Sequence, residues 1–504
     1  MCRFALLLLI GLQAQILTPK PSSQPRINGP AVIGVRPGRP LLYGIPASGE
    51  RPMQFSAKGL PKGLTLDSRS GYISGRLMNR GEYSLTLRVQ NRFGSAERAF
   101  KIIAGDTLAL TPPMGWSSWY CARGNIGDAY IRAQADAMVS SGLAQHGYSY
   151  IDIDDCWNIQ PGSQDPAIGG APRDAQGNLR PNRNFPDMKA LTDYVHGKGL
   201  KIGIYSSPGP LTCGKFEGSQ GHERQDARQF AAWGFDLLKY DWCSYKDRKL
   251  VASREEWEYP YRAMSGYLRD LDRDILLNIC QYGLGDVWKW GREAGGQFWR
   301  SGDDLGWVHR DLWDNLLRFG FSLAGTERWV GPGGWNDPDN IMIGHVILST
   351  SKGRTPLAPT PLTPDEQYTH MTLWALLASP LVFGGDMTKL DEFTIGLLTN
   401  DEVLDINQDL MGKQAAMVSK DGDLQVWAKD LANGAKAVGL FNLGDREAEV
   451  VARWQDLSLR GPHAVRDLWR QKDAGRFDGE FKAPVARHGV VLVKVTAIPS
   501  SETR

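Results

Sequence analysis

Lys239 and Asp241 follow a short apolar run, Leu237-Leu238, in the segment 235–243 and are the residues best placed to do chemistry. A short apolar run bounded by charged residues is typical of a buried parallel strand. Because residues two apart project from the same face of a strand, we expect the two side chains to point together, with the ammonium keeping the carboxylate ionised. Such a carboxylate can attack the anomeric carbon of a sugar. A buried structural ion pair is the alternative interpretation.

Other predicted strands end in acids, bases and aromatic residues that suit the same chemistry. Together these ends contribute Trp119, Asp152, Asp154, Asp155, Tyr205, Lys239, Gln281, Arg300, Asp303, Asp304, Asp337 and Asp339. Carboxylates accept hydrogen bonds from hydroxyl groups, Lys and Arg donate them, and a Trp ring covers the apolar face of a sugar. The set therefore suits a neutral, hydroxyl-rich ligand.

A metal site at Asp152, Asp154 and Asp155 is a competing interpretation, because acidic clusters also bind hard cations. However, no histidine lies near the predicted strand ends, and Lys239 and Arg300 would repel a cation. We therefore predict a site with no metal and no cofactor.

Hydrolysis of a glycosidic bond requires two carboxylates, one on each side of the bond that breaks. Asp241 is the candidate nucleophile, and Asp303 and Asp304 are both candidates for the proton donor. Adjacent residues of a strand face opposite sides, so only one of the two can point at Asp241. Their spacing in the sequence does not choose between them.

The central part of the chain alternates between predicted strands and predicted helices. The predicted strands are residues 114–119, 148–154, 201–206, 236–241, 275–280, 297–302, 329–331 and 380–383. Helical patterns lie between most of them, at residues 129–141, 188–198, 225–233, 257–271, 305–319 and 365–377. This alternation predicts a (β/α)8 TIM barrel, with the active site at the C-terminal ends of the strands. A doubly wound open sheet is the alternative, although no Gly-x-Gly-x-x-Gly motif follows the first predicted strand.

The 504 residues exceed one ordinary domain, and short alternating strands with frequent turn signals flank the central part. We predict a β-sandwich at residues 27–105, the barrel at residues 106–412 and a C-terminal antiparallel β-sandwich at residues 413–498. The first sandwich contains the runs Gly59-Leu-Pro-Lys-Gly-Leu-Thr-Leu-Asp67 and Gly71-Tyr-Ile-Ser-Gly75. These runs resemble the Ig-like modules attached to bacterial secreted enzymes. This sandwich carries no catalytic constellation, so we expect a spacer or packing domain.

The N-terminus has the pattern of a signal peptide, which we predict at residues 1–16. Arg3 supplies a positive charge, residues 4–12 form a short apolar core, and Ala14 is a small residue near the cleavage site. We expect a secreted or periplasmic protein with no membrane span, and an apolar start to a cytosolic chain is the alternative. The net charge of +2 and the lack of a basic run predict no nucleic-acid partner.

Longer motifs are spread over residues 110–415. They are Met114-Gly-Trp-Ser-Ser-Trp119, Ile153-Asp-Asp-Cys-Trp157, Gly199-Leu-Lys-Ile-Gly-Ile-Tyr205, Leu238-Lys-Tyr-Asp-Trp-Cys243, Trp299-Arg300 with Asp304, Gly333-Gly-Trp-Asn-Asp-Pro-Asp339 and Ile406-Asn-Gln-Asp-Leu-Met-Gly412. In this order they resemble the motifs of glycoside hydrolase family 27, the retaining α-galactosidases and α-N-acetylgalactosaminidases. The resemblance implies hydrolysis of terminal α-D-galactose from an oligosaccharide or polysaccharide.

The resemblance also implies a role for each matching residue. Asp241 matches the nucleophile, and Asp304 matches the acid/base because it stands four residues after Arg300. Asp154 and Asp155 match the pair that binds the galactose 4- and 6-hydroxyls. The remaining sugar-contacting positions are Trp119, which matches the aromatic residue that stacks on the ring, and Tyr205, Lys239 and Arg300.

The cysteines follow the family in part. Cys213 and Cys243 match a disulfide that braces the site, and Cys121 with Cys156 is a candidate for a second disulfide. Cys280 matches a family cysteine for which we find no partner in this sequence. We therefore expect a free thiol at Cys280.

One pair of residues departs from the family pattern. Gln281 and Tyr282 follow Cys280, where many family α-galactosidases carry Glu-Trp with the Glu on the sugar 2-hydroxyl. Gln can still bond a hydroxyl, and it is unlike the small residues that make room for an N-acetyl group. We therefore predict an α-galactosidase. The alternatives are a β-L-arabinopyranosidase, because that sugar is galactose without its 6-carbon group, and a non-catalytic galactoside-binding protein, which would have no reason to keep both acids.

Overall fold

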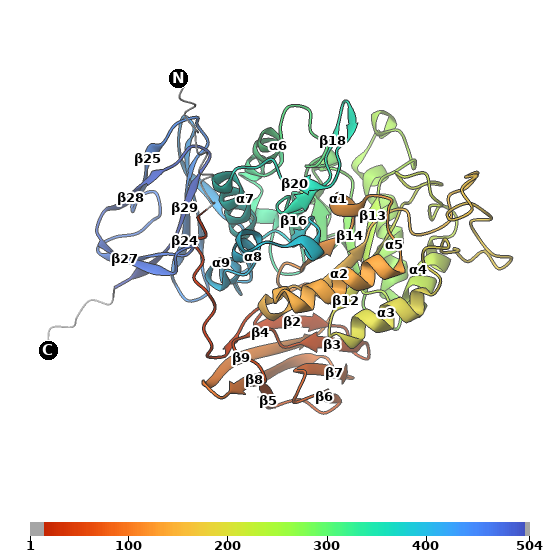
Figure 1. Ribbon diagram of the computed structural model, residues 1–504, viewed down its shortest axis with the longest axis horizontal. Helices are drawn as coiled ribbons and strands as arrows, with labels where there is room; N and C mark the ends of the chain where they lie inside the picture. The colour runs from red at the N-terminus through yellow and green to blue at the C-terminus, as the bar shows by residue number, and fades with distance from the viewer. Residues whose placement is uncertain (1–14, 499–504) are drawn as a thin grey trace, which may run out of the picture.

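The computed structural model describes residues 15–498, which form an N-terminal β module, a central barrel and a C-terminal β domain (Figure 1). The signal peptide predicted at residues 1–16 lies outside the described residues, except for its last two positions. In the described part of the chain, no helix is long and apolar enough to cross a membrane.

The central sheet consists of eight parallel strands in the order β16-β15-β14-β13-β12-β11-β10-β21. Their bounds are β10 Met114–Ser117, β11 Tyr150–Ile153, β12 Lys201–Ser206, β13 Leu237–Asp241, β14 Leu276–Cys280, β15 Phe298–Arg300, β16 Trp335–Asp337 and β21 Leu381–Phe383. Ile341, just after β16, joins the two outer strands. Its amide donates to the Val382 carbonyl at 2.7 Å, and its carbonyl accepts from the Gly384 amide at 3.0 Å. The curled sheet confirms the predicted barrel and excludes the open doubly wound sheet.

Helices cover the outside of the sheet (Figure 1). The longer ones are α2 Asp128–Ser140, α3 Met188–Gly197, α4 Glu223–Trp233, α5 Arg254–Arg269, α6 Leu312–Phe319 and α7 Pro364–Leu376, and the shorter ones are α1 Trp119–Ala122, α8 Glu392–Leu398 and α9 Asp401–Asn407. Side chains that precede the helices fix where several of them begin. Asp187, Ser253 and Asp311 each accept a hydrogen bond from a backbone amide of the first turn, and Thr363 forms a capping box with Glu366.

Two predicted elements are wrong in position. Residues 329–331 do not form the seventh strand, because a Gly-Pro-Gly-Gly turn intervenes in which Gly331 pairs with Gly334 and Gly333 has a φ of +86°. The segment Glu327–Trp329 is a 3-10 helix, and the chain enters the sheet only after the turn, at β16. The helix predicted at residues 305–319 begins only at Leu312, because Asp311 caps it there.

The N-terminal module consists of short antiparallel sheets with one parallel pair. A four-stranded sheet has the order β2-β9-β8-β5, a three-stranded sheet has the order β3-β7-β6, and β1 pairs with β4. The bounds are β1 Arg26–Ile27, β2 Val32–Val35, β3 Pro40–Gly44, β4 Ala47–Ser48, β5 Gln54–Lys58, β6 Leu64–Leu66, β7 Tyr72–Arg76, β8 Gly81–Asn91 and β9 Gly94–Ala104. The sheets enclose a hydrophobic core that is separate from that of the barrel.

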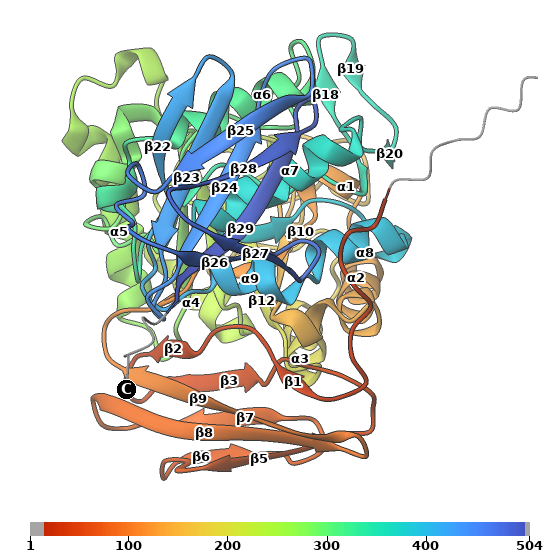
Figure 2. The ribbon, with the colours of Figure 1, turned by 90° about the vertical axis from the view of Figure 1, so that its left-hand side faces the viewer.

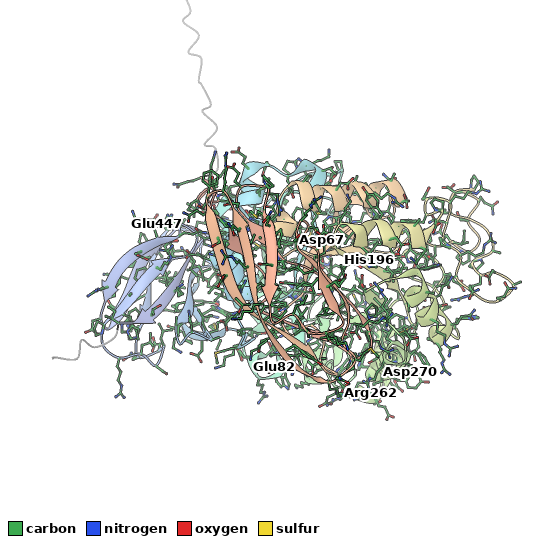
Figure 3. All side chains as sticks on the ribbon, turned by 90° about the horizontal axis from the view of Figure 1, so that it is seen from below. Asp67, Glu82, His196, Arg262, Asp270 and Glu447 are labelled. Carbon is green, nitrogen blue, oxygen red and sulfur yellow. A yellow bond between two sulfur atoms is a disulfide. The ribbon has the colours of Figure 1, made fainter. Side chains whose placement is uncertain are left out.

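The module packs on the face of the barrel where the parallel strands begin (Figures 1 and 3). The Tyr72 hydroxyl donates to the Lys198 carbonyl at 2.6 Å, and the Arg36 amide donates to the Asp274 carboxylate at 2.8 Å. Lys198 and Asp274 lie in loops that lead into β12 and β14. The module therefore supports the end of the barrel opposite to the C-terminal strand ends, and its role as a spacer stays a prediction.

The C-terminal domain has a six-stranded sheet in the order β22-β23-β24-β29-β26-β27 and a second sheet of β25 and β28. The bounds are β22 Ala416–Asp421, β23 Leu424–Asp430, β24 Lys436–Asn442, β25 Ala448–Arg453, β26 His463–Asp467, β27 Lys472–Phe477, β28 Glu480–Val485 and β29 Val490–Ala497. Figure 2 shows this domain facing the viewer, with α7 behind it and the N-terminal module below. Helix α7 is buried throughout residues 366–376, which ties the domain to the barrel.

Candidate active site

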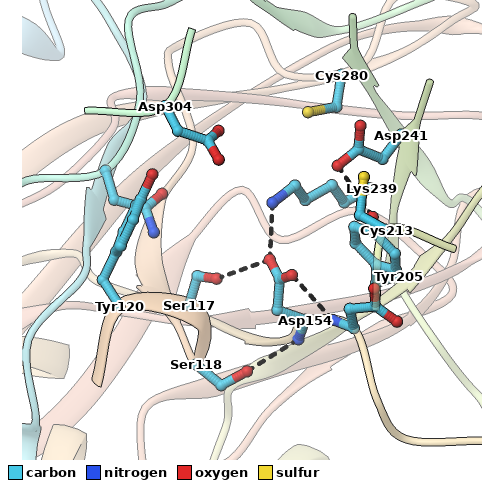
Figure 4. Close-up of polar contacts among 12 residues, drawn as sticks. Ser117, Ser118, Tyr120, Asp154, Tyr205, Cys213, Lys239, Asp241, Cys280 and Asp304 are labelled. Atoms are coloured by element: carbon cyan, nitrogen blue, oxygen red, sulfur yellow. Dashed lines mark hydrogen bonds and ion pairs between the residues drawn. The ribbon is translucent and has the colours of Figure 1, made fainter. Parts of the chain in front are cut away.

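Asp241 ends strand β13, and its carboxylate is held on both oxygens. Tyr205 of β12 donates to Oδ2 at 3.0 Å, and Tyr282, in the loop after β14, donates to Oδ1 at 2.6 Å. The disulfide between Cys213 and Cys243 lies beside them, with its sulfurs and an Asp241 oxygen all within 4.8 Å of one another. The carboxylate is therefore fixed in orientation at the C-terminal end of the barrel (Figure 4).

The environment of Asp241 acts on its pKa in both directions. Burial raises the pKa of the carboxyl, and the negative charge of Asp304 adds to that effect. The Lys239 charge and the hydroxyls of Tyr282 and Tyr205 lower it. The hydroxyl groups favour the ionised form because they donate to a charge that has lost its water.

The positive charge of Lys239 lowers the pKa of Asp241 as predicted, but the hydrogen-bond partner of Lys239 is another carboxylate. The Lys239 Nζ lies 2.7 Å from Oδ2 of Asp154, which follows β11 (Figure 4). The lysine side chain is long enough to cross the barrel interior, where it meets a buried carboxylate that needs a counter-charge. Lys239 therefore acts on Asp241 through space and not through a hydrogen bond.

Asp154 and Asp155 are both buried and already bonded to the protein. Asp154 accepts from the Ser117 hydroxyl at 3.4 Å and from the Asp155 amide at 2.8 Å. Asp155 accepts from the backbone amides of Cys156 and Gly214 at 2.7 and 2.6 Å, while burial raises its pKa to about 7. These contacts fix both carboxylates as acceptors for hydroxyl groups.

The same contacts argue against the cation interpretation. The Lys239 ammonium already lies on the Asp154 oxygen that a cation would need. Over residues 15–498, the metal-type cluster that the structure forms joins Asp241 to Cys213 and Cys243. Those two cysteines share a disulfide and no longer offer thiolates.

Asp304 lies across the site from Asp241, in the loop after β15 (Figure 4). The Arg300 Nη2 lies 3.2 Å from a carboxylate oxygen of Asp304 and 3.2 Å from one of Asp339. Asp303 is exposed, and its carboxylate accepts from the Asp304 amide at 3.0 Å. The geometry therefore selects Asp304 over Asp303 as the acid that faces Asp241. Arg300 is buried, so it orients Asp304 from behind.

Sequence reasoning gave no role to three residues of this network. Asp339 stood among the acids near strand ends, and its carboxylate accepts from the Tyr120 hydroxyl at 2.5 Å. Tyr120 and Tyr282 directly follow the predicted site residues Trp119 and Gln281. This adjacency to a motif was the available signal, but it does not say which of two neighbours turns inward.

Trp119 and Gln281, two of the predicted sugar-contacting residues, lie in different environments. Trp119 is half-buried at the start of α1, with the Arg123 guanidinium 4.8 Å from its ring centroid. Gln281 is fully buried, and its amide donates to the Leu284 carbonyl. The contact of Gln281 with a sugar 2-hydroxyl stays a prediction, and Tyr282 is the member of the pair that reaches Asp241.

The cysteine predictions have mixed outcomes. The disulfide between Cys213 and Cys243 is confirmed, with a Cα–Cα distance of 5.1 Å, and Cys280 is free as expected. The second disulfide is wrong, because Cys121 and Cys156 are both free. The Cys121 thiol lies against the Tyr130 hydroxyl at 3.4 Å. The Cys156 thiol lies between Gly214 and Gly124 and forms no bond with Cys121.

Comparisons with known sequences agree with this arrangement. A family described as Alpha galactosidase A matches residues 111–409, and a family described as Alpha galactosidase C-terminal beta sandwich domain matches residues 421–495. An Ig domain family matches residues 24–104. Alpha-galactosidase 2 of Arabidopsis thaliana is 38% identical over 404 residues, which cover 79% of this chain and 92% of that protein.

Solved structures extend the likeness to most of the chain. A Bacteroides fragilis protein, a candidate α-galactosidase, has a TM-score of 0.84 and 34% identity, with 94% of this chain and 98% of that chain covered. A β-L-arabinopyranosidase from Geobacillus stearothermophilus has a TM-score of 0.68 and 27% identity, with 78% and 98% covered. With the order of the motifs, the barrel and the two facing carboxylates, these matches show that the chain belongs to glycoside hydrolase family 27, the α-galactosidase family.

Proposed function

We propose that the protein releases terminal α-D-galactose from galactosides with retention of configuration. The observation that carries this proposal is the Asp241 carboxylate, which is immobilised on both oxygens and faces Asp304 across the site. The family membership supports the choice of sugar, since the Arabidopsis thaliana relative named above is an α-galactosidase.

The proposed mechanism is a double displacement. An oxygen of Asp241 attacks the anomeric carbon while Asp304 gives its proton to the leaving oxygen. Water then attacks the same carbon, and Asp304 takes the proton of that water as a base. Retention predicts a separation of about 5–5.5 Å between the two carboxyl groups.

Asp154 and Asp155 supply acceptors for the sugar hydroxyls, with Lys239 as a donor beside Asp154. Their bonds to the backbone and to Lys239 hold these groups in place before the sugar binds, which lowers the cost of ordering the site. We infer a galactose-containing oligosaccharide or polysaccharide as the substrate. The predicted signal peptide supports a secreted or periplasmic location, where the disulfide between Cys213 and Cys243 can form.

A β-L-arabinopyranosidase is the second candidate, and the likeness to the Geobacillus stearothermophilus enzyme of that activity favours keeping it. A panel of nitrophenyl glycosides separates the two: α-galactoside, β-L-arabinopyranoside, α-N-acetylgalactosaminide and α-glucoside. Preference for the α-galactoside, with α-galactose as the first product in an NMR time course, supports the proposal. Preference for the arabinoside would show that the enzyme is specific for β-L-arabinopyranose and would leave the proposed mechanism unchanged.

The roles of the two acids are tested by a pair of adjacent variants. Asp304→Asn should lower kcat/KM on an oligosaccharide by about 10²–10⁴-fold, because the leaving oxygen loses its proton donor. The loss should be smaller on a dinitrophenyl galactoside, whose leaving group needs no proton. Asp303→Asn is the matched control, since Asn keeps the acceptor for the Asp304 amide. An equal loss on both substrates, or a loss confined to Asp303→Asn, would contradict the assignment.

A non-catalytic galactoside-binding protein is the alternative from another class. Galactose binding by the wild-type protein with no turnover of any glycoside in the panel would support it. Turnover that disappears in Asp241→Ala while galactose binding persists would exclude it.

A further inference from the structure

Tyr282 is the closest hydrogen-bond donor to the nucleophilic carboxylate. Its hydroxyl lies 2.6 Å from Asp241 Oδ1, while the Tyr205 hydroxyl lies 3.0 Å from Oδ2. Hydrogen bonds to a carboxylate are about twice as strong as those between neutral groups. Each tyrosine therefore donates a hydrogen bond to a different oxygen of the carboxylate.

The backbone around Tyr282 is built to turn this side chain into the site. Its φ is +67°, a left-handed conformation that a bulky residue seldom adopts outside a constrained site. The next residue anchors the loop, because the Gly283 amide donates to the Arg300 carbonyl at 3.0 Å. The preceding residue, Gln281, is buried with its amide on the Leu284 carbonyl. In a regular strand, the neighbouring side chains of Gln281 and Tyr282 would point to opposite faces. The left-handed φ of Tyr282 breaks this alternation.

Neighbouring groups also fix the Tyr282 ring. Arg248 belongs to the segment that follows β13, and its guanidinium lies 3.9 Å from the centroid of the Tyr282 ring. The hydroxyl lies 3.5 Å from the Cys213 sulfur and 3.8 Å from the Cys243 sulfur. A cation over one face and a disulfide at the hydroxyl leave the ring little freedom to rotate away from Asp241.

We infer that Tyr282 is a further positioning residue of the reaction, which holds Asp241 as a carboxylate and stabilises it as the leaving group of the second step. This inference rests on the proposed function. In the first step, an Asp241 oxygen bonds to the anomeric carbon, the bond to the leaving group breaks, and the leaving oxygen takes the proton of Asp304. In the second step, water bonds to that carbon and gives its proton to Asp304, and the electron pair of the carbon–oxygen bond returns to Asp241.

The hydroxyl of Tyr282 has different effects on the two steps. It donates more strongly to the charged carboxylate than to the neutral ester of the covalent intermediate. It therefore favours departure of Asp241 in the second step and restrains its attack in the first. Loss of the hydroxyl should slow release of the sugar from the enzyme more than it slows formation of the intermediate.

The test is Tyr282→Phe, with Tyr240→Phe as the matched control. Tyr240 is the neighbour of Asp241 on the same strand, and its hydroxyl is buried without a hydrogen-bond partner among the described residues. On a dinitrophenyl galactoside, Tyr282→Phe should lower kcat by about 10- to 100-fold, with KM falling in parallel and kcat/KM nearly unchanged. A galactosyl-enzyme should accumulate and be seen by mass spectrometry. Tyr240→Phe should behave like the wild type.

The pH profile gives a second readout that loss of packing would not produce. The carboxylate of Asp241 loses a donor in Tyr282→Phe, so the acidic limb of kcat/KM should move up by about one pH unit. Tyr282→Trp fills the space under Arg248 without a hydroxyl and should show the same shift if Tyr282→Phe does not fold. A parallel fall of kcat and kcat/KM with an unmoved acidic limb, or wild-type kinetics, would overturn the inference.

Different outcomes contradict the proposed function and the role of Tyr282. Wild-type turnover on the glycoside panel is measured first, and the variants are then compared on whichever glycoside the wild type hydrolyses. A wild type without turnover contradicts the proposed function. An active wild type whose Tyr282→Phe variant behaves identically contradicts only the role of Tyr282.

Discussion

Lys429 is a buried charge at the interface between the C-terminal domain and the barrel. It lies on β23, is 5% exposed, and its Nζ donates to the Ala375 carbonyl at 3.1 Å. Ala375 lies in the last turn of α7, where the helix dipole favours a positive charge. Burial nevertheless lowers the pKa of Lys429 from 10.5 to about 7, with the distant charge of Asp409 opposing the shift.

The size of this shift sets an upper limit on what the charge costs the fold. A fall from 10.5 to about 7, at 1.36 kcal/mol for each pKa unit, corresponds to about 5 kcal/mol. Side-chain relaxation and water penetration relieve part of such a penalty. We expect Lys429 to destabilise the folded protein by about 2–3 kcal/mol at low pH.

The pH dependence follows from a folded-state pKa that lies below the unfolded one. Below pH 7 both states carry the proton, so the folded state bears the full cost of the buried charge. Between about pH 7 and 10.5 the folded state releases the proton while the unfolded state keeps it, so the free energy of unfolding rises with pH. Only well above pH 10.5 are both states neutral, and the cost has then disappeared.

The perturbation is Lys429→Met, which keeps the length of the side chain and removes its charge. The Ala375 carbonyl keeps the Ala378 amide as a donor at 3.3 Å, so it is not left unsatisfied. We expect the variant to be more stable than the wild type by about 2–3 kcal/mol at pH 6 and by less than about 1 kcal/mol at pH 10. Unfolding in urea is followed by tryptophan fluorescence, to which Trp427 on the same strand contributes as one of the 17 tryptophans of the chain.

The matched control is Lys420→Met, an exposed lysine on the neighbouring strand β22. It should change the free energy of unfolding by less than about 0.5 kcal/mol at both pH values. If Lys429→Met raises the free energy of unfolding by the same amount at pH 6 and pH 10, or lowers it at pH 6, the reasoning from burial is refuted.

Two further predictions concern the barrel. Lys239→Met leaves the buried Asp154 carboxylate without its counter-charge, so we expect a loss of about 3–5 kcal/mol in the free energy of unfolding and a higher KM, measured by urea unfolding and steady-state kinetics. An unchanged urea midpoint would show that Asp154 does not need this partner. Thiol titration of the denatured, unreduced protein with residues 15–504 should give three thiols, from Cys121, Cys156 and Cys280; one thiol would mean that Cys121 and Cys156 are bonded after all.

Most of the barrel was predictable because its pattern is local. A run such as Leu237-Leu238 ending in charged residues marks a parallel strand wherever it occurs, and the helices between strands carry their own caps. The seventh strand was misplaced because the Gly-rich turn at residues 331–334 follows a hydrophobic pair, Trp329-Val330, that resembles a strand start. Only the pairing of Trp335 with Phe298 sets where the strand begins.

Of the two predicted disulfides, the structure confirms one and contradicts the other. Cys213 and Cys243 lie in the loops that follow the neighbouring strands β12 and β13, and the resemblance to the family predicted their disulfide. Cys121 and Cys156 also follow neighbouring strands, but Cys156 has a φ of +81° and its thiol lies between Gly214 and Gly124 without bonding to Cys121. A backbone angle of this kind cannot be derived from spacing.

The sequence by itself determined the alternation of strands and helices, the ring of acids and aromatic residues at the strand ends, and the identity of Asp241 as the nucleophile candidate. Only the tertiary structure decided which partners these residues have: Lys239 pairs with Asp154, Asp304 faces the site in place of Asp303, and Tyr282 reaches Asp241 in place of Gln281. The physical reason is that periodicity along the chain places a side chain on a face, whereas a hydrogen bond depends on length, backbone angle and neighbouring strands, which become defined only when the barrel closes.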